Sequence, residues 1–228
     1  QLLFSRPEVE AWEEIKKNVL EVLDLIERHE VWCELTSAID KQQSKSTYEK
    51  LDWILKASNK GMNMMSGFVD AHTVKKMLMN ARVVTALIEI FNCDASLEGK
   101  DDANANTRRI AAKVNTALQA MCKGNAPLQN ELYERSRDTI IDYSKDLTNP
   151  TAGFATLTEI FQDNVDLCET VPSRIPEEIA QAILNRKYQP GDFTGTLLDP
   201  LYALVICRGK PVRRNQKTVM AALWSEEN

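Results

Sequence analysis

Apolar residues recur every three or four positions along most of this chain, which is the spacing of amphipathic helices. Two helix starts carry capping signals: Ser5 with Glu8 three residues later, and Asp70 before the range 71–91. The same spacing predicts further helices over 31–40, 47–58, 108–122, 127–143, 154–164, 165–171, 176–184, 197–207 and 212–223. No segment alternates apolar and polar residues for long enough to predict a strand. The pattern therefore predicts an all-α fold of about ten helices.

Two of these helices have well-defined apolar faces. The first helix is acidic on one side, and its apolar side is expected to contain Val9, Trp12, Ile15, Val19, Val22 and Ile26. The helix over 71–91 has a broader stripe that consists of Val74, Met77, Leu78, Ala81, Val84, Leu87, Ile88 and Phe91. A stripe of this breadth predicts burial between neighbouring helices.

Turns are expected where Gly, Pro and short polar residues interrupt the helical spacing. The range 60–67 holds two glycines and three methionines, and we interpret it as a turn whose methionines fill the core rather than form a binding surface. Asn149-Pro150 together with Gly153 predicts another turn. The range 98–107 is the most polar stretch and predicts an exposed loop.

The predicted helices are grouped in a regular way. Many units pair a shorter helix with a longer one, at a spacing of roughly 40 residues, which is typical of armadillo and HEAT repeats. The hypothesis for the fold is therefore an armadillo/HEAT-like helical solenoid, with a helical bundle as the structural alternative.

Composition and charge restrict the class of protein. The 228 residues are 43% hydrophobic and 27% charged, which excludes collagen-like and wholly disordered chains. The net charge of -5 disfavours a general nucleic-acid binder. The charge is also polarised, because residues 1–30 hold four basic and eight acidic side chains whereas residues 186–228 hold seven basic and four acidic ones.

A run of basic residues near the end of the sequence is the candidate binding site. Its members are Arg208, Lys210, Arg213, Arg214 and Lys217. Such a run is typical of a solvated helix face, and it would equally suit an acidic partner segment or a phosphate ligand.

The sequence offers little for catalysis. It has no phosphate-binding loop, no dinucleotide-binding glycine motif and no zinc-protease motif. With His29 and His72 as the only histidines, a nucleophile–histidine pair is difficult to build. We therefore expect no enzymatic activity, no cofactor and no metal site.

The cysteines and the apolar runs bear on the compartment. Five cysteines, with no CxxC pair, stand in apolar helical contexts and predict reduced, mostly buried thiols in a cytosolic protein: Cys33, Cys93, Cys122, Cys168 and Cys207. The longest strictly apolar run, 201–207, is far shorter than the roughly 20 residues of a membrane helix. We expect no insertion of this segment into a membrane.

Four segments, taken in order, resemble one known family. A helix over 109–125 ends in a Cys-Lys-Gly-Asn turn, and a Gln-Asn-Glu-Leu sequence at 129–132 opens the next helix. The range 157–168 ends in Ile-Phe-Gln-Asp-Asn-Val-Asp-Leu-Cys, a short partner helix follows, and 198–216 contains a closing helix, a Gly-Lys turn and a Gln. This order resembles the RIH domain, the homology region shared by ryanodine receptors and inositol trisphosphate receptors.

The resemblance also assigns parts to the chain. It covers about two thirds of the sequence, so we expect an RIH-like armadillo domain over 69–228, which includes the polar loop at 98–107, and preceding helices of the same solenoid over 1–68. The range 75–91 is similar to the basic helix of the family that precedes its first polar loop.

The ligand site of the family is not carried over. Lys75 and Lys76 fit the basic helix, but His72 and Met79 stand where the family has arginines. The range 125–128 replaces a Tyr-Arg-Lys cluster, so the basic groups that a trisphosphate needs are missing. The chain is more similar to the central copy of the domain than to the ligand-binding copy.

The resemblance implies a function without chemistry. It implies a regulatory domain on the cytosolic face of the endoplasmic reticulum, within a homotetrameric calcium-release channel, that relays ligand-induced changes towards the pore. Its expected partners are other domains and subunits of the channel and protein regulators, and not nucleic acid. The alternative is a stand-alone helical-repeat scaffold that binds an acidic peptide or partner domain.

Overall fold

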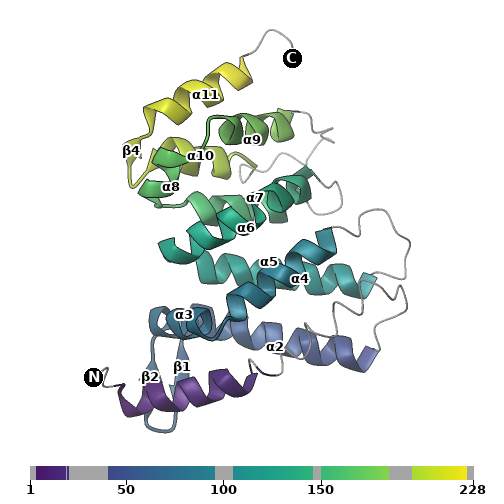
Figure 1. Cartoon of the computed structure of the whole chain (residues 1–228), viewed down its shortest axis with the longest axis vertical. Coiled ribbons are helices and arrows are strands. Elements are labelled where there is room, and N and C mark those ends of the chain that lie inside the picture. The colour runs from purple at the N-terminus through teal and green to yellow at the C-terminus, as the bar shows by residue number, and fades with distance from the viewer. Residues whose placement is uncertain are drawn as a thin grey trace. The chain divides into compact units, whose positions relative to one another are not determined.

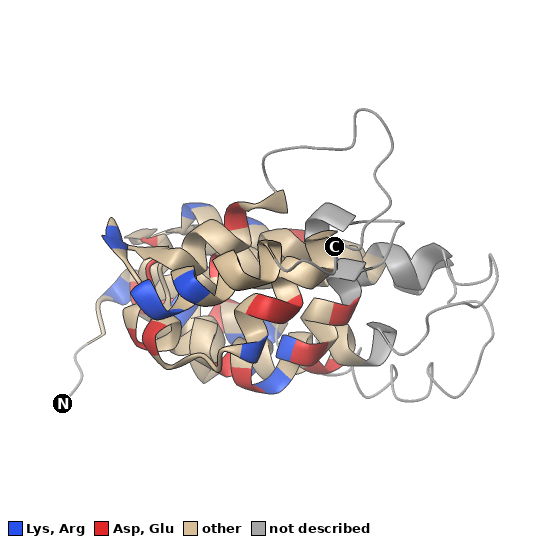
Figure 2. Cartoon of the chain, turned by 90° about the horizontal axis from the view of Figure 1, so that it is seen from above, with Lys and Arg blue, Asp and Glu red and all other residues tan. Residues whose placement is uncertain are grey.

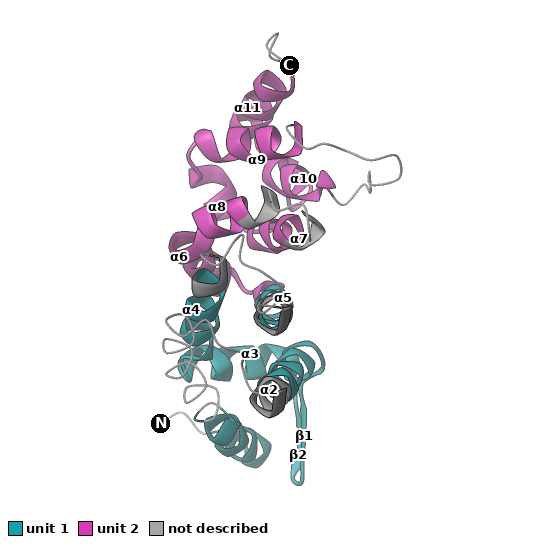
Figure 3. Cartoon of the chain, turned by 90° about the vertical axis from the view of Figure 1, so that its right-hand side faces the viewer, with its two compact units in different colours: residues 1–121 teal, residues 122–228 magenta. Residues whose placement is uncertain are grey.

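The computed structural model of the protein describes residues 4–18, 20, 41–95, 105–145, 150–184 and 197–224. Helices make up most of these residues, as the all-α expectation requires (Figure 1). The chain divides into two compact units, unit 1 over residues 1–121 and unit 2 over residues 122–228 (Figure 3). No helix in the described ranges combines the length and the apolar character that crossing a membrane requires.

Unit 1 begins with a helix over residues 6–18. As expected from the capping pattern, the Glu8 carboxylate accepts hydrogen bonds from the backbone N–H of Ser5 at 2.7 Å and from its hydroxyl at 2.6 Å. The buried side of this helix is centred on Ala11 and Ile15, and Val9 is 48% exposed. The prediction that Val9 lies on the buried face was therefore wrong. The predicted residues of this face beyond residue 18 are not among the described side chains.

The next helix, α2 (Lys41–Lys60), ends at Gly61. Gly61 has a φ of 76°, and its N–H bonds to the carbonyl of Ala57 at 3.0 Å, which is a common way for a helix to terminate. The predicted helix over 47–58 lies within α2, and the one over 31–40 lies outside the described residues.

A short hairpin follows α2, where the sequence predicted a turn and no strand. Strands β1 (Met62–Met64) and β2 (Gly67–Val69) pair antiparallel, with Met62 opposite Val69. Strands of three residues are too short to produce a recognisable alternation. Met62 is buried, but Met65 at the tip is fully exposed, so the expectation that these methionines fill the core was wrong for Met65.

The predicted helix over 71–91 is divided into two. Asp70 caps α3 (Ala71–Asn80) as expected, because its carboxylate accepts from the N–H groups of His72 at 2.9 Å and Thr73 at 3.1 Å. The chain then turns at Arg82, whose φ is 60°, before α4 (Val83–Ala95) begins. Every residue of the predicted stripe is buried except Ala81, which precedes the turn and is half-buried.

The last helix of unit 1 is α5 (Ala105–Cys122), which starts inside the segment predicted as a polar loop. The ammonium of Lys113 on α5 forms an ion pair with Asp52 on α2 and lies 4.8 Å from the centre of the Tyr48 ring. The hydrogen bond to Asp52 raises the pKa of the Lys113 ammonium above its ordinary value. They hold α5 against α2. The rest of the predicted loop lies outside the described residues.

Unit 2 contains six helices and one hairpin in the part that the structure describes. In chain order its elements are α6 (Ala126–Lys145), α7 (Pro150–Phe161), α8 (Val165–Thr170), α9 (Arg174–Leu184), α10 (Asp199–Val205), β3 (Ile206–Cys207), β4 (Lys210–Pro211) and α11 (Arg213–Leu223). Helix α6 packs on α7, α7 on α10, and α9 on α11. Phe154, Phe161 and Leu128 lie in the core between these helices, each with an exposed fraction of 0%.

One helix boundary agrees with the sequence-based expectation, and two boundaries in unit 2 differ from it. Gly124 stops α5 with a φ of 66°, as expected. Helix α7 already begins at Pro150, a residue suited to the first turn, so the predicted turn through Gly153 was wrong. Helix α10 ends at Val205 rather than at 207, because Ile206 and Cys207 pair with β4.

Candidate partner-binding surface

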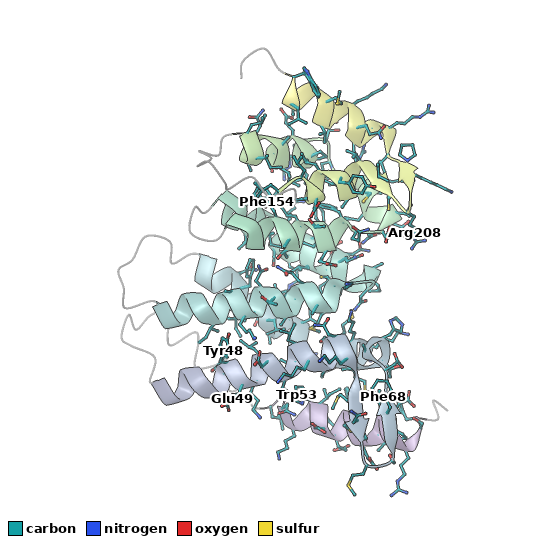
Figure 4. All side chains as sticks on the ribbon, turned by 180° about the vertical axis from the view of Figure 1, so that it is seen from behind. Tyr48, Glu49, Trp53, Phe68, Phe154 and Arg208 are labelled. Carbon is teal, nitrogen blue, oxygen red and sulfur yellow. The ribbon has the colours of Figure 1, made fainter. Side chains whose placement is uncertain are left out.

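The five basic residues singled out in the sequence lie on two adjoining elements of unit 2. The residues of this basic surface are Arg208 and Lys210 in hairpin β3–β4, and Arg213, Arg214 and Lys217 in α11. All five are exposed. Figure 4 shows Arg208 at the edge of the unit and Phe154 in its interior.

The turn of the hairpin is held by a loop that is distant in sequence. Arg208 and Gly209 form a two-residue turn with φ values of 48° and 72°, the pattern of a type I′ turn. An arginine in this conformation is unusual and needs support. Asp163 supplies it, because its carboxylate accepts from the Arg208 N–H at 3.1 Å and its carbonyl accepts from Arg208 Nε at 3.2 Å.

The orientation of α11 is set by one buried carboxamide. Asn215 is 1% exposed, and its Nδ2 donates to the carbonyls of Cys168 at 2.8 Å and Leu204 at 3.0 Å. Arg214 adds a bond from its guanidinium to the carbonyl of Val171. Because Asn215 faces inwards, the side chains on the other side of α11 face solvent.

These contacts divide the basic surface into two groups. The guanidinium groups of Arg208 and Arg214 are engaged by backbone carbonyls within unit 2. The side chains of Lys210, Arg213 and Lys217 form no hydrogen bond or ion pair with the residues that the structure describes. The first turn of α11 contains no acidic residue to offset the positive end of its helix dipole. These three cations are therefore the ones available to an acidic partner.

Two exposed apolar residues at the C-terminal end of α11 were missed by the sequence analysis. Met220 is 52% exposed and Trp224 is 71% exposed. Met220 lies in the last turn of α11, and Trp224 caps its C-terminal end. For Met220 the sequence contained a signal, because at about 100° per residue Met220 falls on a different side of the helix from Val219 and Ala222, which are buried.

A chain of hydrogen bonds connects the helices beneath this surface. Gln129 of α6 is 2% exposed, and its amide donates to the carbonyls of Glu159 at 2.7 Å and Gln162 at 3.1 Å, at the end of α7. Such side-chain donors satisfy carbonyls that a helix end leaves unpaired. Asn164 then caps α8 through the N–H of Leu167 at 3.2 Å.

The same chain continues towards α11. Asn164 donates to Asn130 of α6 at 2.8 Å. The thiol of Cys168 in α8 lies 3.3 Å from the carbonyl of Phe161 and 3.6 Å from that of Ala203 in α10. Asn215 of α11 donates to the carbonyl of Cys168 and so completes the chain of hydrogen bonds. Five helices are therefore joined by polar side chains that are buried or half-buried in unit 2.

The thiols in this region are unsuited to chemistry. Burial, and then the neighbouring Cys207, raise the pKa of Cys168 to about 12, and burial also raises the pKa of Cys207. Both thiols stay protonated at neutral pH, whereas nucleophilic attack and metal binding need the thiolate. Cys122, Cys168 and Cys207 are buried and form no disulfide bond, as expected. The side chains of Cys33 and Cys93 are not among those that the structure describes.

No group of three potential metal-ligating His, Cys, Asp or Glu side chains occurs among the described residues. Comparison with known proteins adds no assignment: the chain matches no protein-family model, and no curated protein matches it significantly.

Proposed function

We propose that this chain is a cytosolic, armadillo-like coupling domain of a homotetrameric calcium-release channel of the endoplasmic reticulum. The observation that carries the proposal is the buried hydrogen-bond chain of unit 2. Gln129, Asn164, Cys168 and Asn215 all fall in the segments that resemble the RIH domain. In this proposal, the shared residues serve to join helices to one another rather than to bind a ligand.

This arrangement suits the transmission of movement. The donors Gln129, Asn164 and Asn215 are buried, so breaking one of their bonds would leave a buried polar group unpaired at a cost of about 1–3 kcal/mol. Helices joined in this way move together, and a shift at one end becomes a rigid-body displacement at the other. Coupling free energies of about 1–3 kcal/mol are sufficient for allosteric control. The partners in this proposal are other domains and subunits of the channel, and protein regulators.

The test of the proposal is the size and location of the whole protein. An antibody against this chain should detect, in cells that produce it, a band many times larger than 25.8 kDa in the membrane fraction only. Chemical cross-linking of that fraction should multiply the mass fourfold, as a tetramer requires. A soluble band near 25.8 kDa would contradict the channel proposal.

Inositol trisphosphate provides a second test, which asks whether the chain corresponds to the central copy of the RIH domain or to the ligand-binding copy. Because the expected basic positions are occupied by His72, Met79 and the range 125–128, we expect no binding heat when the 228-residue chain is titrated with this ligand. Binding at micromolar affinity would contradict the assignment to the central copy.

A second candidate function is supported by the exposed cations. We propose, as the alternative, a stand-alone helical scaffold that binds an acidic peptide through Lys210, Arg213 and Lys217. Its affinity for a poly-glutamate peptide should fall steeply with salt. The double variant Lys210→Glu/Arg213→Glu should abolish binding, whereas Lys56→Glu, an exposed lysine of unit 1, should not. Binding that is unchanged in the double variant would contradict this alternative.

A further inference from the structure

One side of α11 is exposed along its whole length. Arg213, Lys217 and Met220 stand at positions i, i+4 and i+7 of α11, so they lie within a sector of roughly 60° around the helix axis. Trp224, the residue that caps the C-terminal end of α11, follows four positions after Met220. The two basic residues come first along the chain, and the two exposed apolar residues follow them. We call these four residues the outer stripe.

The neighbouring helices of unit 2 do not use this stripe. Helix α11 packs on α9 and α10 through its opposite side, where Asn215, Val219 and Ala222 are buried. The hydrogen bonds of Asn215 prevent α11 from rotating to bury the stripe instead. Arg213 and Lys217 also have no acidic partner among the residues that the structure describes. The stripe therefore combines exposed cations that lack a described acidic partner with exposed apolar area.

We propose that the outer stripe binds an acidic amphipathic helix of a partner domain. The inference rests on the proposal that the basic surface is a contact surface, and it adds the apolar half and the form of the partner. Spacings of three and four residues are those at which one helix packs its side chains against another. The partner helix would place carboxylates against Arg213 and Lys217 and aliphatic side chains against Met220 and Trp224.

Charge favours a helix over an anionic membrane as the occupant. The whole chain has a net charge of -5, and acidic residues are interspersed with basic ones over the helices (Figure 2). A bilayer surface extends far beyond the stripe, so the net negative charge of the protein would repel anionic headgroups. A single helix is about as wide as α11 and contacts the stripe alone.

The experiment measures binding of a labelled probe to the 228-residue chain by fluorescence anisotropy. The probe is a helical peptide with Glu, Glu, Leu and Leu at the same spacing as the stripe, and a second probe carries the reverse order. We expect one of the two orders to bind. Trp224→Ala should weaken this binding about tenfold, as loss of an aromatic anchor does. Tyr202→Ala removes another exposed aromatic residue, 60% exposed on α10, and should leave binding unchanged.

A charge exchange separates loss of contact from loss of folding. Arg213→Glu/Lys217→Glu should lose the acidic probe and gain affinity for a probe in which Lys replaces Glu, which a misfolded variant would not do. If poly-glutamate binds as tightly as the probe and Trp224→Ala has no effect, the inference is wrong but the acidic-partner proposal stands. If no acidic peptide binds, both are wrong. Binding to phosphatidylserine vesicles alone would overturn the helix in favour of a membrane.

Discussion

Among single residues, the buried carboxamide of Asn215 has the largest consequence for the surface of unit 2. It joins α11 to α8 and α10 through two carbonyls and thereby decides which side chains of α11 face solvent. Which basic side chains face solvent therefore depends on these two hydrogen bonds as well as on where the basic residues stand in the sequence. The exposure of the basic residues on α11 thus depends on a polar side chain that is itself buried.

Replacing Asn215 with alanine should destabilise unit 2. The carbonyls of Cys168 and Leu204 would lose their donor while buried, so we expect a loss of about 2 kcal/mol in the free energy of unfolding, measured with urea. Gln216→Ala is the control, because the Gln216 amide is half-buried and lies 3.4 Å from the Val205 carbonyl. Equal losses in the two variants would show that Asn215 has no special role.

The thiol of Cys168 predicts a dependence of stability on alkaline pH. Its pKa is raised to about 12 by burial, whereas the unfolded chain titrates at a pKa near the ordinary value of 9.0. The unfolded state therefore loses its proton first, and stability that is complete below about pH 8 declines as the pH rises towards 12. Between about pH 8 and pH 9.5, the free energy of unfolding should fall by about 1 kcal/mol more in the wild type than in Cys168→Ala. Parallel curves would contradict the raised pKa.

At the scale of elements, left-handed residues decide where helices stop. Gly61 and Gly124 end α2 and α5 with similar positive φ values, but their surroundings differ. A Cβ at Gly61 would overlap the carbonyl oxygen of Val69 and lie 2.7 Å from Cζ of Phe68. A Cβ at Gly124 would meet no atom within 4 Å.

The two glycines therefore predict different costs for the same substitution. Gly124→Ala should cost about 1 kcal/mol, the penalty of a left-handed conformation for a residue with a Cβ. Gly61→Ala should cost at least about 3 kcal/mol, because hairpin β1–β2 must also move away from the end of α2. Thermal unfolding of both variants measures the difference, and similar melting temperatures would mean that the hairpin is not held against Gly61.

At the scale of the whole molecule, the two units are expected to respond separately to local damage. Amide hydrogen exchange reports opening in contiguous cooperative units. In Asn215→Ala, exchange should accelerate in α8, α10 and α11 of unit 2, while protection in α2, α3 and α4 of unit 1 stays as in the wild type. Faster exchange in both units would indicate that the chain opens as a single cooperative body.

Local signals determined a large part of this protein. The helical class, the Asp70 cap, the buried stripe of α3 and α4, and the stop at Gly124 could be predicted, because helix periodicity and capping depend on residues within one or two turns. The exposure of the basic run could be predicted for the same reason. The solenoid, the channel function and its partners stay predictions.

Only the tertiary structure decided the remainder. No glycine marks the break at Arg82, and strands of three residues are too short to carry a pattern of their own. Arg208 is anchored by Asp163, which is 45 residues away, whereas Lys210 two positions later has no such contact. Contacts between residues distant in sequence leave no periodic trace, because they depend on how already formed helices pack. For this reason the sequence identified five candidate cations, and the fold separated the anchored ones from those available to a partner.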